Sequence, residues 1–434
     1  MKGIIVKFEL NEQKNGQAAV LGLQHLLAMY SGSILVPILI ASALNYSSEQ
    51  LTYLISTDIF MCGVATFLQL QMNKYFGIGL PVVLGVAFQS VAPLSLIGAK
   101  HGSGAIFGSI IASGIFVILI SGFFSKVRRF FPPLVTGSVI TVIGLTLIPV
   151  AMGNIANNQT PADLKSLILA AITIVIILAI QFLTKGFLRS IAVLIGLVVG
   201  TIAASTVGMV DTSVIKEAPV FHLPTPFFFG APKFELTSII MMIIIAMVSM
   251  VESTGVYLAL SDITGQELSQ KKLRNGYRAE GLAVLLGGIF NTFPYTGFSQ
   301  NVGLVQLSGI RSRKPIFFTA LFLMILGLVP KFGAMAQLVP APVLGGGMLV
   351  LFGMVAVQGM RMLGNVDFNN EHNLLIAGFS IAVGLGFNSS ASIFTNLPNS
   401  LQMFISNGIV MASVTAIVLN SIFNRKSKVA LSND

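Results

Sequence analysis

Charged residues are scarce in this sequence. Only 9% of the 434 residues are Asp, Glu, Lys or Arg, whereas 54% are hydrophobic and the mean hydropathy is +0.88. A soluble globular domain carries roughly a quarter of its residues as charged side chains, so this composition excludes that class. The apolar residues form roughly fourteen segments of about twenty residues, the length of a helix that crosses about 30 Å of hydrocarbon. The composition therefore predicts an all-α polytopic membrane protein.

Cysteine and catalytic motifs are nearly absent as well. The single cysteine, Cys62, lies in an apolar run, so disulfides play no part. The sequence has no Cys/His cluster with the spacing of a metal site, no phosphate-binding loop and no nucleophile elbow. We therefore expect no enzyme activity, no metal and no cofactor. The first apolar run extends from Gln17 past Leu39, too long for the core of a cleavable signal.

The net charge of +10 comes from Lys and Arg residues whose placement is one-sided. If the chain starts in the cytoplasm and crosses the membrane about fourteen times, 20 of the 25 basic residues are cytoplasmic. The five outer ones are Lys100, Lys165, Lys216, Lys233 and Lys331. This asymmetry follows the positive-inside rule and predicts that both termini are cytoplasmic. It also removes the reason to expect a nucleic-acid partner.

Glycine, proline and polar residues interrupt two of the apolar stretches. Residues Phe290 to Arg313 read FNTFPYTGFSQNVGLVQLSGIRSR, and residues Phe76 to Gly98 read FGIGLPVVLGVAFQSVAPLSLIG. Broken backbone at membrane depth is tolerated only where protein buries it or where it lines a watery cavity. Both stretches are therefore candidates for a substrate site, although Gly and Pro are also generally common in membrane helices.

An internal repeat relates the two stretches. Pro133 begins a string that resembles the one at Pro342, 209 residues later, and Gln89 and Gln300 are 211 residues apart. One unit of the repeat holds about seven segments, an odd number, so the second copy enters the membrane from the opposite side. This predicts an inverted repeat, in which paired Gly/Pro-interrupted segments mark the binding site of a transporter.

Glu252 is the strongest candidate for a substrate ligand. It lies in the apolar run MVSMVESTGVYLAL without a Lys or Arg nearby, and the cost of a charge at that depth makes a functional role the default interpretation. Its carboxylate can accept ring N–H groups of a planar substrate; the alternative is a protonated glutamate bonded to neighbouring helices. Gln300 and Asn301 open a half-helix, and their amides suit the donor and acceptor edge of a purine or pyrimidine.

The remaining ionisable residues in apolar runs carry weaker signals. Glu280 is expected at a helix start beside Arg278, so it is either a site residue or half of an interfacial ion pair. His25, which follows Gln24, is either a site residue or a neutral donor and acceptor between helices. We assign Asp58 a structural role.

At these residues the chain resembles the nucleobase-ascorbate transporter family, also called the nucleobase:cation symporters. The family signature is Gln or Glu followed by Asn-x-Gly, four more residues, then Thr and a basic residue or Gly. It appears here as QNVGLVQLSG from Gln300 to Gly309, with Ser308 at the position where the family usually has Thr. Other matching strings are QHLLAMYSGSILVP, FGIGLPVVLGVAF, ESTGVYLALSDITG and RAEGLAVLLGGIFNTFPYTGFSQNVG. The resemblance covers essentially the whole chain and is greatest to the bacterial xanthine and uric acid permeases.

The resemblance implies a 7+7 inverted repeat of about fourteen segments, with short strands in segments 3 and 10, usually as a homodimer in the lipid bilayer. It also implies a core domain and a gate domain that rock against each other. The expected division is a cytoplasmic N-terminus (1–15), core (16–124 and 237–337), gate (125–211 and 338–423), external loop (212–236) and cytoplasmic tail (424–434).

The resemblance also assigns roles to residues. Glu252 and Gln300 match the residues that hold the base, and Asn301 and Gly303 belong to the same signature. Phe88 matches the aromatic side chain that packs on the base, although an ordinary core phenylalanine is the alternative.

Substrate choice and coupling follow from further matched positions. Uracil-type members commonly carry Glu at the position of Gln300, so Gln favours a purine dione. Ala87 leaves space beside the matched ring, which predicts that the extra 8-oxo group of uric acid is tolerated. His25 and Glu280 match polar residues that shape the site and proton coupling, and Gln24, which precedes His25, is counted with them.

The expected function is a proton-coupled symporter that imports xanthine, and uric acid if this space admits it, across the cytoplasmic membrane. The alternatives are a permease for uracil or another nucleobase and an anion transporter with the same 7+7 fold.

Overall fold

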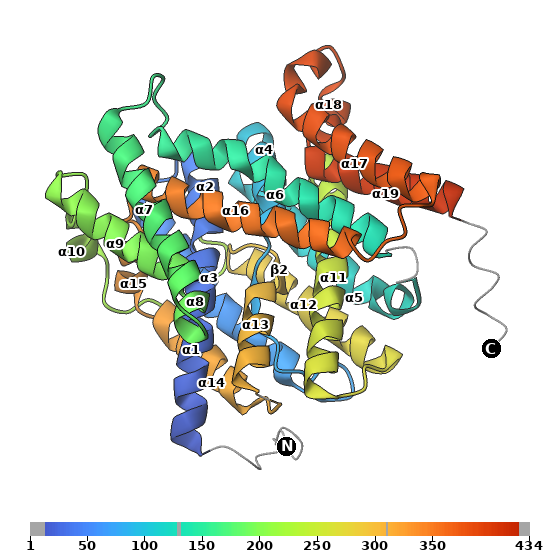
Figure 1. The fold of residues 1–434 in the computed structure, drawn as a ribbon, viewed down its shortest axis with the longest axis horizontal. Coiled ribbons are helices and arrows are strands. Elements are labelled where there is room, and N and C mark those ends of the chain that lie inside the picture. Colours follow the sequence, from blue (N-terminus) through green and yellow to red (C-terminus); the bar gives the residue numbers. More distant parts are fainter. Residues whose placement is uncertain (1–13, 128–131, 310, 425–434) are drawn as a thin grey trace. The chain divides into compact units, whose positions relative to one another are not determined.

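The computed structural model describes residues 14–127, 132–309 and 311–424. Within these ranges the protein is built almost entirely of helices, as Figure 1 shows, and it has two short strands, β1 and β2. Residues 1–13, residues 425–434 and the basic pair Arg128 and Arg129 lie outside the described residues. The predicted cytoplasmic placement of those segments therefore stays a prediction.

The elements of the first half of the chain run in order from α1 to α10. They are α1 (Asn15–Ser33), α2 (Leu35–Leu44), α3 (Ser48–Leu70), β1 (Leu84–Val86), η1 (Phe88–Ser90), α4 (Val91–His101), α5 (Ser103–Val127), α6 (Pro133–Ile155), α7 (Leu164–Leu183), α8 (Phe187–Ser190), α9 (Ala192–Thr206) and α10 (Ser213–Glu217).

The second half begins with α11, a helix of 29 residues. Its elements are α11 (Leu236–Thr264), α12 (Gln270–Ile289), β2 (Tyr295–Gly297), α13 (Ser299–Ser308), α14 (Lys314–Gly327), α15 (Pro330–Ala336), α16 (Ala341–Leu363), α17 (Glu371–Ser389), η3 (Ala391–Phe394), α18 (Asn399–Ile405) and α19 (Gly408–Phe423). The order α3, β1, α4, α5, α6, α7, α9 thus recurs as α12, β2, α13, α14, α16, α17, α19.

Polar residues just before several helices determine where these helices begin. Ser47 and Gln50 form a reciprocal capping box at α3, and Ser269 accepts a hydrogen bond from the backbone N–H of Lys272 at α12. Asn407 accepts one from Val410 at α19. Such caps satisfy backbone donors that a helix leaves unpaired at its first turn, each typically contributing about 1 kcal/mol.

The register of the two strands is the one that a two-fold repeat requires. β1 and β2 pair antiparallel, with Leu84 opposite Gly297 and Val86 opposite Tyr295. Leu84 and Tyr295 are 211 residues apart, as are Val86 and Gly297. The repeat therefore maps one of these pairs onto the other. Two copies of a strand related by a two-fold axis perpendicular to them run antiparallel, as observed here.

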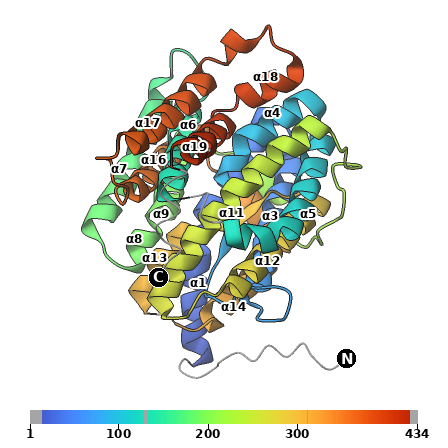
Figure 2. The same ribbon diagram turned by 90° about the vertical axis from the view of Figure 1, so that its right-hand side faces the viewer.

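Helix packing repeats in the same way. The Cα of Gly63 on α3 faces the backbone of Ala320 on α14, and a Cβ added at Gly63 would lie 2.7 Å from the Ala320 oxygen. At the repeat-related contact, Gly281 and Gly288 bring α12 close to α5, and Figure 2 shows these two helices beside each other. Small residues let membrane helices approach closely enough for extensive van der Waals contact.

The contacts within the chain define two compact units. One comprises Met1–Ser125 and Gly153–Gly347, and the other comprises Lys126–Met152 and Met348–Asp434. Both strands, α3, α11 and α12 belong to the first unit. In the second unit Leu134, Leu363, Ile376 and Ala377 form a buried apolar cluster.

Seven helices in the described ranges are long and apolar enough to cross a membrane, or up to eight if the bent pair α14 and α15 is one span. α9 and α19 are apolar but shorter, and the two interrupted stretches are each a strand followed by a short helix. The predicted membrane-protein class agrees with these spans, whereas the count of fourteen segments stays a prediction.

Gly63→Ala should destabilise the protein, because the new methyl group would collide with the α14 backbone. Overpacking of this kind costs about 1–3 kcal/mol. The measurement is the melting temperature of the purified protein in detergent. Gly378→Ala on α17 is the matched control, since no atom lies within 4 Å of its added Cβ. Equal melting temperatures for the two variants would contradict this account of the α3 and α14 contact.

Candidate functional site

The two interrupted stretches meet at the β1 and β2 pair. The ladder extends beyond both strands, because Ala87 N–H donates to the Pro294 oxygen and Phe298 N–H donates to the Val83 oxygen, each at 2.9 Å. After the strands the chain enters η1 and α4 on one side and α13 on the other. Irregular backbone at membrane depth is thus paired within the protein.

Glu252 lies on α11, which packs against β2 and η1. Its Oε2 accepts hydrogen bonds from Gln89 Nε2 at 3.0 Å and from Thr296 Oγ1 at 3.3 Å. Gln89 Nε2 also lies 2.8 Å from Ser249 Oγ, one turn earlier on α11. Glu252 is partly exposed, whereas Gln89 is buried. One carboxylate oxygen is therefore fixed by donors from both interrupted stretches.

Sequence reasoning used Gln89 only as a marker of the repeat and missed this contact. The signal available was its correspondence to Gln300, since a position matched to a candidate ligand is itself a candidate. Its partner Glu252 is 163 residues away along the chain, which no local pattern reveals.

Gln300 and Asn301 open α13, as predicted. Gln300 is partly buried, and its Oε1 lies 3.4 Å from Ser299 Oγ. Asn301 is buried and points elsewhere, because its Nδ2 donates to the His25 backbone oxygen at 3.1 Å and lies 3.2 Å from His25 Nδ1. The structure thus brings His25 and Asn301 together and joins α1 to α13.

The remaining predicted positions differ in how closely they are packed. Phe88 and Ala87 are both buried, with Ala87 fully enclosed. Gly303 lies on α13 with no atom within 4 Å of an added Cβ. Gln24 is half-buried on α1, and the structure records no hydrogen bond from its side chain to the described residues. The hydrogen bond to Pro294 places Ala87 at the strand crossing, and Phe88 follows it as the first residue of η1. The contacts described for Gln24 and Gly303 do not place them there.

The predicted helix start at Glu280 is wrong. α12 begins ten residues earlier, at Gln270, so Glu280 lies in mid-helix and is buried. It accepts a hydrogen bond from Tyr257 Oη at 3.0 Å, and Gln69 Nε2 donates to the same Tyr257 oxygen at 2.9 Å. The neighbouring Arg278 instead donates to Ser121 Oγ. Hydropathy located the apolar run but not the polar first turns of this helix.

A hydroxyl pair connects the surroundings of the two acids. Ser253 Oγ and Thr296 Oγ1 are 3.1 Å apart, and Ser253 Oγ also accepts the Gly297 N–H at 2.9 Å. Ser253 makes a polar contact with Glu280, and Thr296 hydrogen-bonds to Glu252. Polar groups therefore run without interruption from Glu252 to Glu280 through β2.

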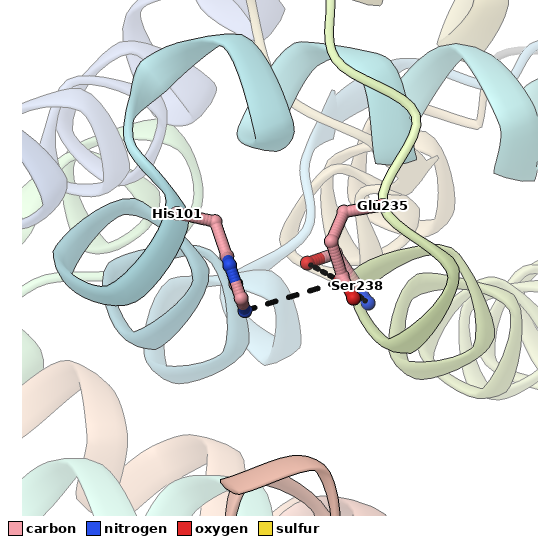
Figure 3. A network of polar contacts seen from close by, with 3 residues as sticks. All are labelled: His101, Glu235 and Ser238. Carbon is pink, nitrogen blue, oxygen red and sulfur yellow. Dashed lines mark hydrogen bonds and ion pairs between the residues drawn. The ribbon is translucent and has the colours of Figure 1, made fainter.

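Outside the membrane spans, the ends of α4 and α11 are also linked. Figure 3 shows Glu235, the residue before α11, between His101 and Ser238. Its Oε2 accepts from Ser238 N–H at 2.6 Å and from Ser238 Oγ at 2.7 Å, and lies 4.0 Å from His101 Nε2. Burial opposes ionisation, but hydrogen bonds from Ser238 and Thr237 outweigh it and lower the pKa of Glu235 to about 2. Glu235 is thus a charged cap that faces the last residue of α4.

Two further features bear on the type of site. Within 14–127, 132–309 and 311–424, no three His, Cys, Asp or Glu side chains are grouped so that they could hold a metal ion. A cavity of about 260 Å³ is lined by residues of the first half of α3, of α10 and the loop after it, and of the α14 and α15 bend, but not by Glu252 or Gln300.

Comparison with known proteins identifies the family. A profile of the Permease family matches residues 16–393. The xanthine permease of Bacillus subtilis (strain 168) is 52% identical over 416 residues, which cover 95% of both chains. The uric acid permease PucK of the same strain is 51% identical over 421 residues, covering 96% of this chain and 98% of the relative. The chain belongs to the nucleobase-ascorbate transporter family.

More distant relatives agree with membership of this transporter family. The uric acid transporter UacT of Escherichia coli (strain K12) is 38% identical over 416 residues, covering 94% of this chain and 86% of the relative. The family consists of permeases, so this protein is a transporter and not an enzyme, as the sequence predicted.

Solved structures confirm the fold class. The transmembrane domain of a cyanobacterial bicarbonate transporter, BicA, matches with a TM-score of 0.63 at 14% identity, covering 96% of this chain and 99% of that one. SLC26A9 matches with the same TM-score and identity over 94% of this chain and 66% of its own. At this identity the likeness concerns the fold of this nucleobase-ascorbate transporter and not its cargo.

Proposed function

We propose that this permease imports xanthine and uric acid across the cytoplasmic membrane in symport with protons. Relatives that are about half identical over nearly their whole length are named as permeases for these two compounds. Both compounds are planar purines whose rings carry N–H and C=O groups around the edge. The site therefore needs acceptors and donors in one plane and an apolar surface for the ring face.

The observation that carries this proposal is the position of Glu252. Gln89 and Thr296 hold one oxygen of its carboxylate, and the side chain is partly exposed. The carboxylate can then accept N–H groups of a base, while the Gln300 amide meets another part of the ring edge. Phe88 packs on the ring face, as aromatic side chains commonly do against planar ligands.

The remaining predicted site residues complete the proposal. Ala87 leaves room beside the ring, and Gly303 and Asn301 shape α13 behind Gln300. His25, with Gln24 beside it, supports α13 through its contacts with Asn301.

We assign proton coupling to Glu252, Glu280 and the hydroxyl groups that lie between them. Ser253 and Thr296 join the surroundings of the two carboxyl groups. A proton bound at Glu280 reduces the repulsion that a charged Glu252 experiences, so protonation and substrate binding favour each other. Reciprocal coupling of this kind is what a symporter requires.

The transport cycle is proposed to follow the predicted core and gate division. The core (16–124 and 237–337) carries the strands and rocks against the gate (125–211 and 338–423), with cytoplasmic termini and a homodimer as the assembly. Alternating access by inverted-repeat transporters works through such rigid-body movement around a fixed site.

Uptake of labelled xanthine tests the function directly, in cells that lack their own purine and uracil permeases. We expect uptake that unlabelled xanthine and uric acid reduce, that uracil does not, and that a protonophore abolishes. Competition by uracil alone would indicate a uracil permease, and uptake of bicarbonate or sulfate without purine uptake would indicate an anion transporter. Either result would overturn the proposal.

Glu252→Gln should lower xanthine affinity at least about 100-fold, because the lost carboxylate leaves the substrate N–H groups without a charged acceptor. Binding to the purified variant is measured by calorimetry, which separates binding from translocation. Glu217→Gln, an exposed carboxylate on α10, is the matched control and should bind normally. Unchanged binding by the Glu252 variant would refute the site assignment.

Ala87→Asn should lower the ratio of uric acid uptake to xanthine uptake about tenfold, which corresponds to about 1.4 kcal/mol. The reason is that the larger side chain would occupy the space in which we propose that the 8-oxo group of uric acid lies. Ala87 is fully buried, so the melting temperature of the variant must be measured as well. Ala87→Ser, which adds a single oxygen, should shift the ratio in the same direction by less. An unchanged ratio in both variants would exclude this specificity role.

A further inference from the structure

One face of α3 is polar although the helix is buried. Asp58, Cys62, Thr66 and Gln69 are spaced by four, four and three residues, which places them on the same side of a helix. All four are fully buried. Buried polar groups at membrane depth are costly, so each is expected to have a partner or a function.

Two of these residues hold the first residues of the two strands. Thr66 Oγ1 accepts the Leu84 N–H at 3.0 Å and lies 3.5 Å from the Leu84 oxygen. Asp58 Oδ1 accepts a hydrogen bond from Tyr295 Oη at 3.3 Å. Leu84 and Tyr295 are equivalent positions of the repeat, 211 residues apart. One helix therefore anchors both copies of the strand.

The contact at Asp58 is part of a closed cluster. Tyr295 Oη also lies 2.6 Å from Thr292 Oγ1, and the backbone of Phe293 hydrogen-bonds to Asp58. Cys62 Sγ lies 4.0 Å from the other Asp58 oxygen. The Asp58 carboxyl group thus contacts Phe293 and Tyr295, and through Tyr295 it is linked to Thr292, all in the segment that leads into β2.

The residue after Tyr295 reaches the proposed substrate carboxylate. Thr296 donates to Glu252, and its backbone pairs with Gly85 in β1. A shift of Tyr295 would move Thr296 with it, because a planar peptide bond joins the two residues within one paired strand. The Asp58 cluster thus fixes the start of β2, while Ser253 on α11 accepts the Gly297 N–H at its end.

We propose that Asp58 is a positioning residue for transport, which holds β2 through Tyr295 so that Thr296 and Gln89 together orient Glu252. This inference rests on the proposed function only where its test measures xanthine uptake. In this role Asp58 acts as a hydrogen-bond acceptor. The proposed role differs from the purely structural role expected from the sequence, because it specifies that the orientation of Glu252 is lost when Asp58 is removed.

The first test measures the strands without any substrate. Hydrogen exchange of the backbone amides of residues 84–87 and 295–298 is followed by mass spectrometry on the purified, full-length protein. Asp58→Ala and Tyr295→Phe should each accelerate this exchange about tenfold, and Asp58→Asn, which keeps an acceptor oxygen, should change it less than about threefold. The matched control is Ser109→Ala, because that buried hydroxyl donates only within its own helix, to the Ile106 oxygen.

The second test uses xanthine uptake by the same variants in proteoliposomes. Asp58→Ala and Tyr295→Phe should each raise KM about tenfold with the maximal rate within about twofold. The effect on KM in the double variant should be smaller than the product of the two single effects, since both changes remove the Asp58–Tyr295 hydrogen bond. Asp58→Asn and Ser109→Ala should resemble the wild type.

Two results would overturn the inference. The first is unchanged strand exchange in Tyr295→Phe. The second is loss of proton-driven uptake in Asp58→Asn with wild-type strand exchange, which would make the acid itself the functional group. If the wild type takes up no purine, the proposed function fails while the exchange experiment still decides the role of Asp58. If Asp58→Ala does not fold, Tyr295→Phe removes the same hydrogen bond without removing the buried acid.

Discussion

The backbone hydrogen bonds of the two interrupted stretches are the constraint on which the rest of this structure depends. In hydrocarbon there is no water to satisfy a free N–H or C=O, so a broken helix is stable only if the protein supplies partners. Here each stretch supplies them to the other, through the β1 and β2 ladder and its extensions at Ala87 and Phe298. Because the two strands come from opposite halves of the repeat, neither half alone can form this pair.

Side chains from the surrounding helices also hydrogen-bond to the backbone of the two interrupted stretches. Thr66 satisfies the backbone of Leu84, Ser253 accepts from Gly297, and Gln69 accepts the Ile78 N–H. These residues come from α3 and α11, which carry unusually many buried polar groups for apolar helices. Groups that satisfy broken backbone are therefore neighbours of the groups assigned to substrate and proton. Stability and function share one polar cluster at the strand crossing.

Local sequence reasoning succeeded where the signal lies within one segment. The apolar runs predicted the membrane class, and Gln300 and Asn301 do lie in the first turn of α13. It failed for Glu280, because a helix that begins with Gln, Lys and Arg does not differ in hydropathy from a loop. It left Asp58 as merely structural, because Tyr295, its partner, is 237 residues away.

The sequence by itself determined that this protein crosses the membrane, that its two halves repeat and that two stretches are broken, since composition, spacing and glycine or proline content are local properties. Its similarity to known permeases determined the family. Only the tertiary structure decided that Gln89 and Thr296 hold Glu252, that Asn301 turns to His25 and that α3 anchors both strands. The physical reason is that a buried hydrogen bond is specified by where helices pack, and packing joins residues that no sequence window contains.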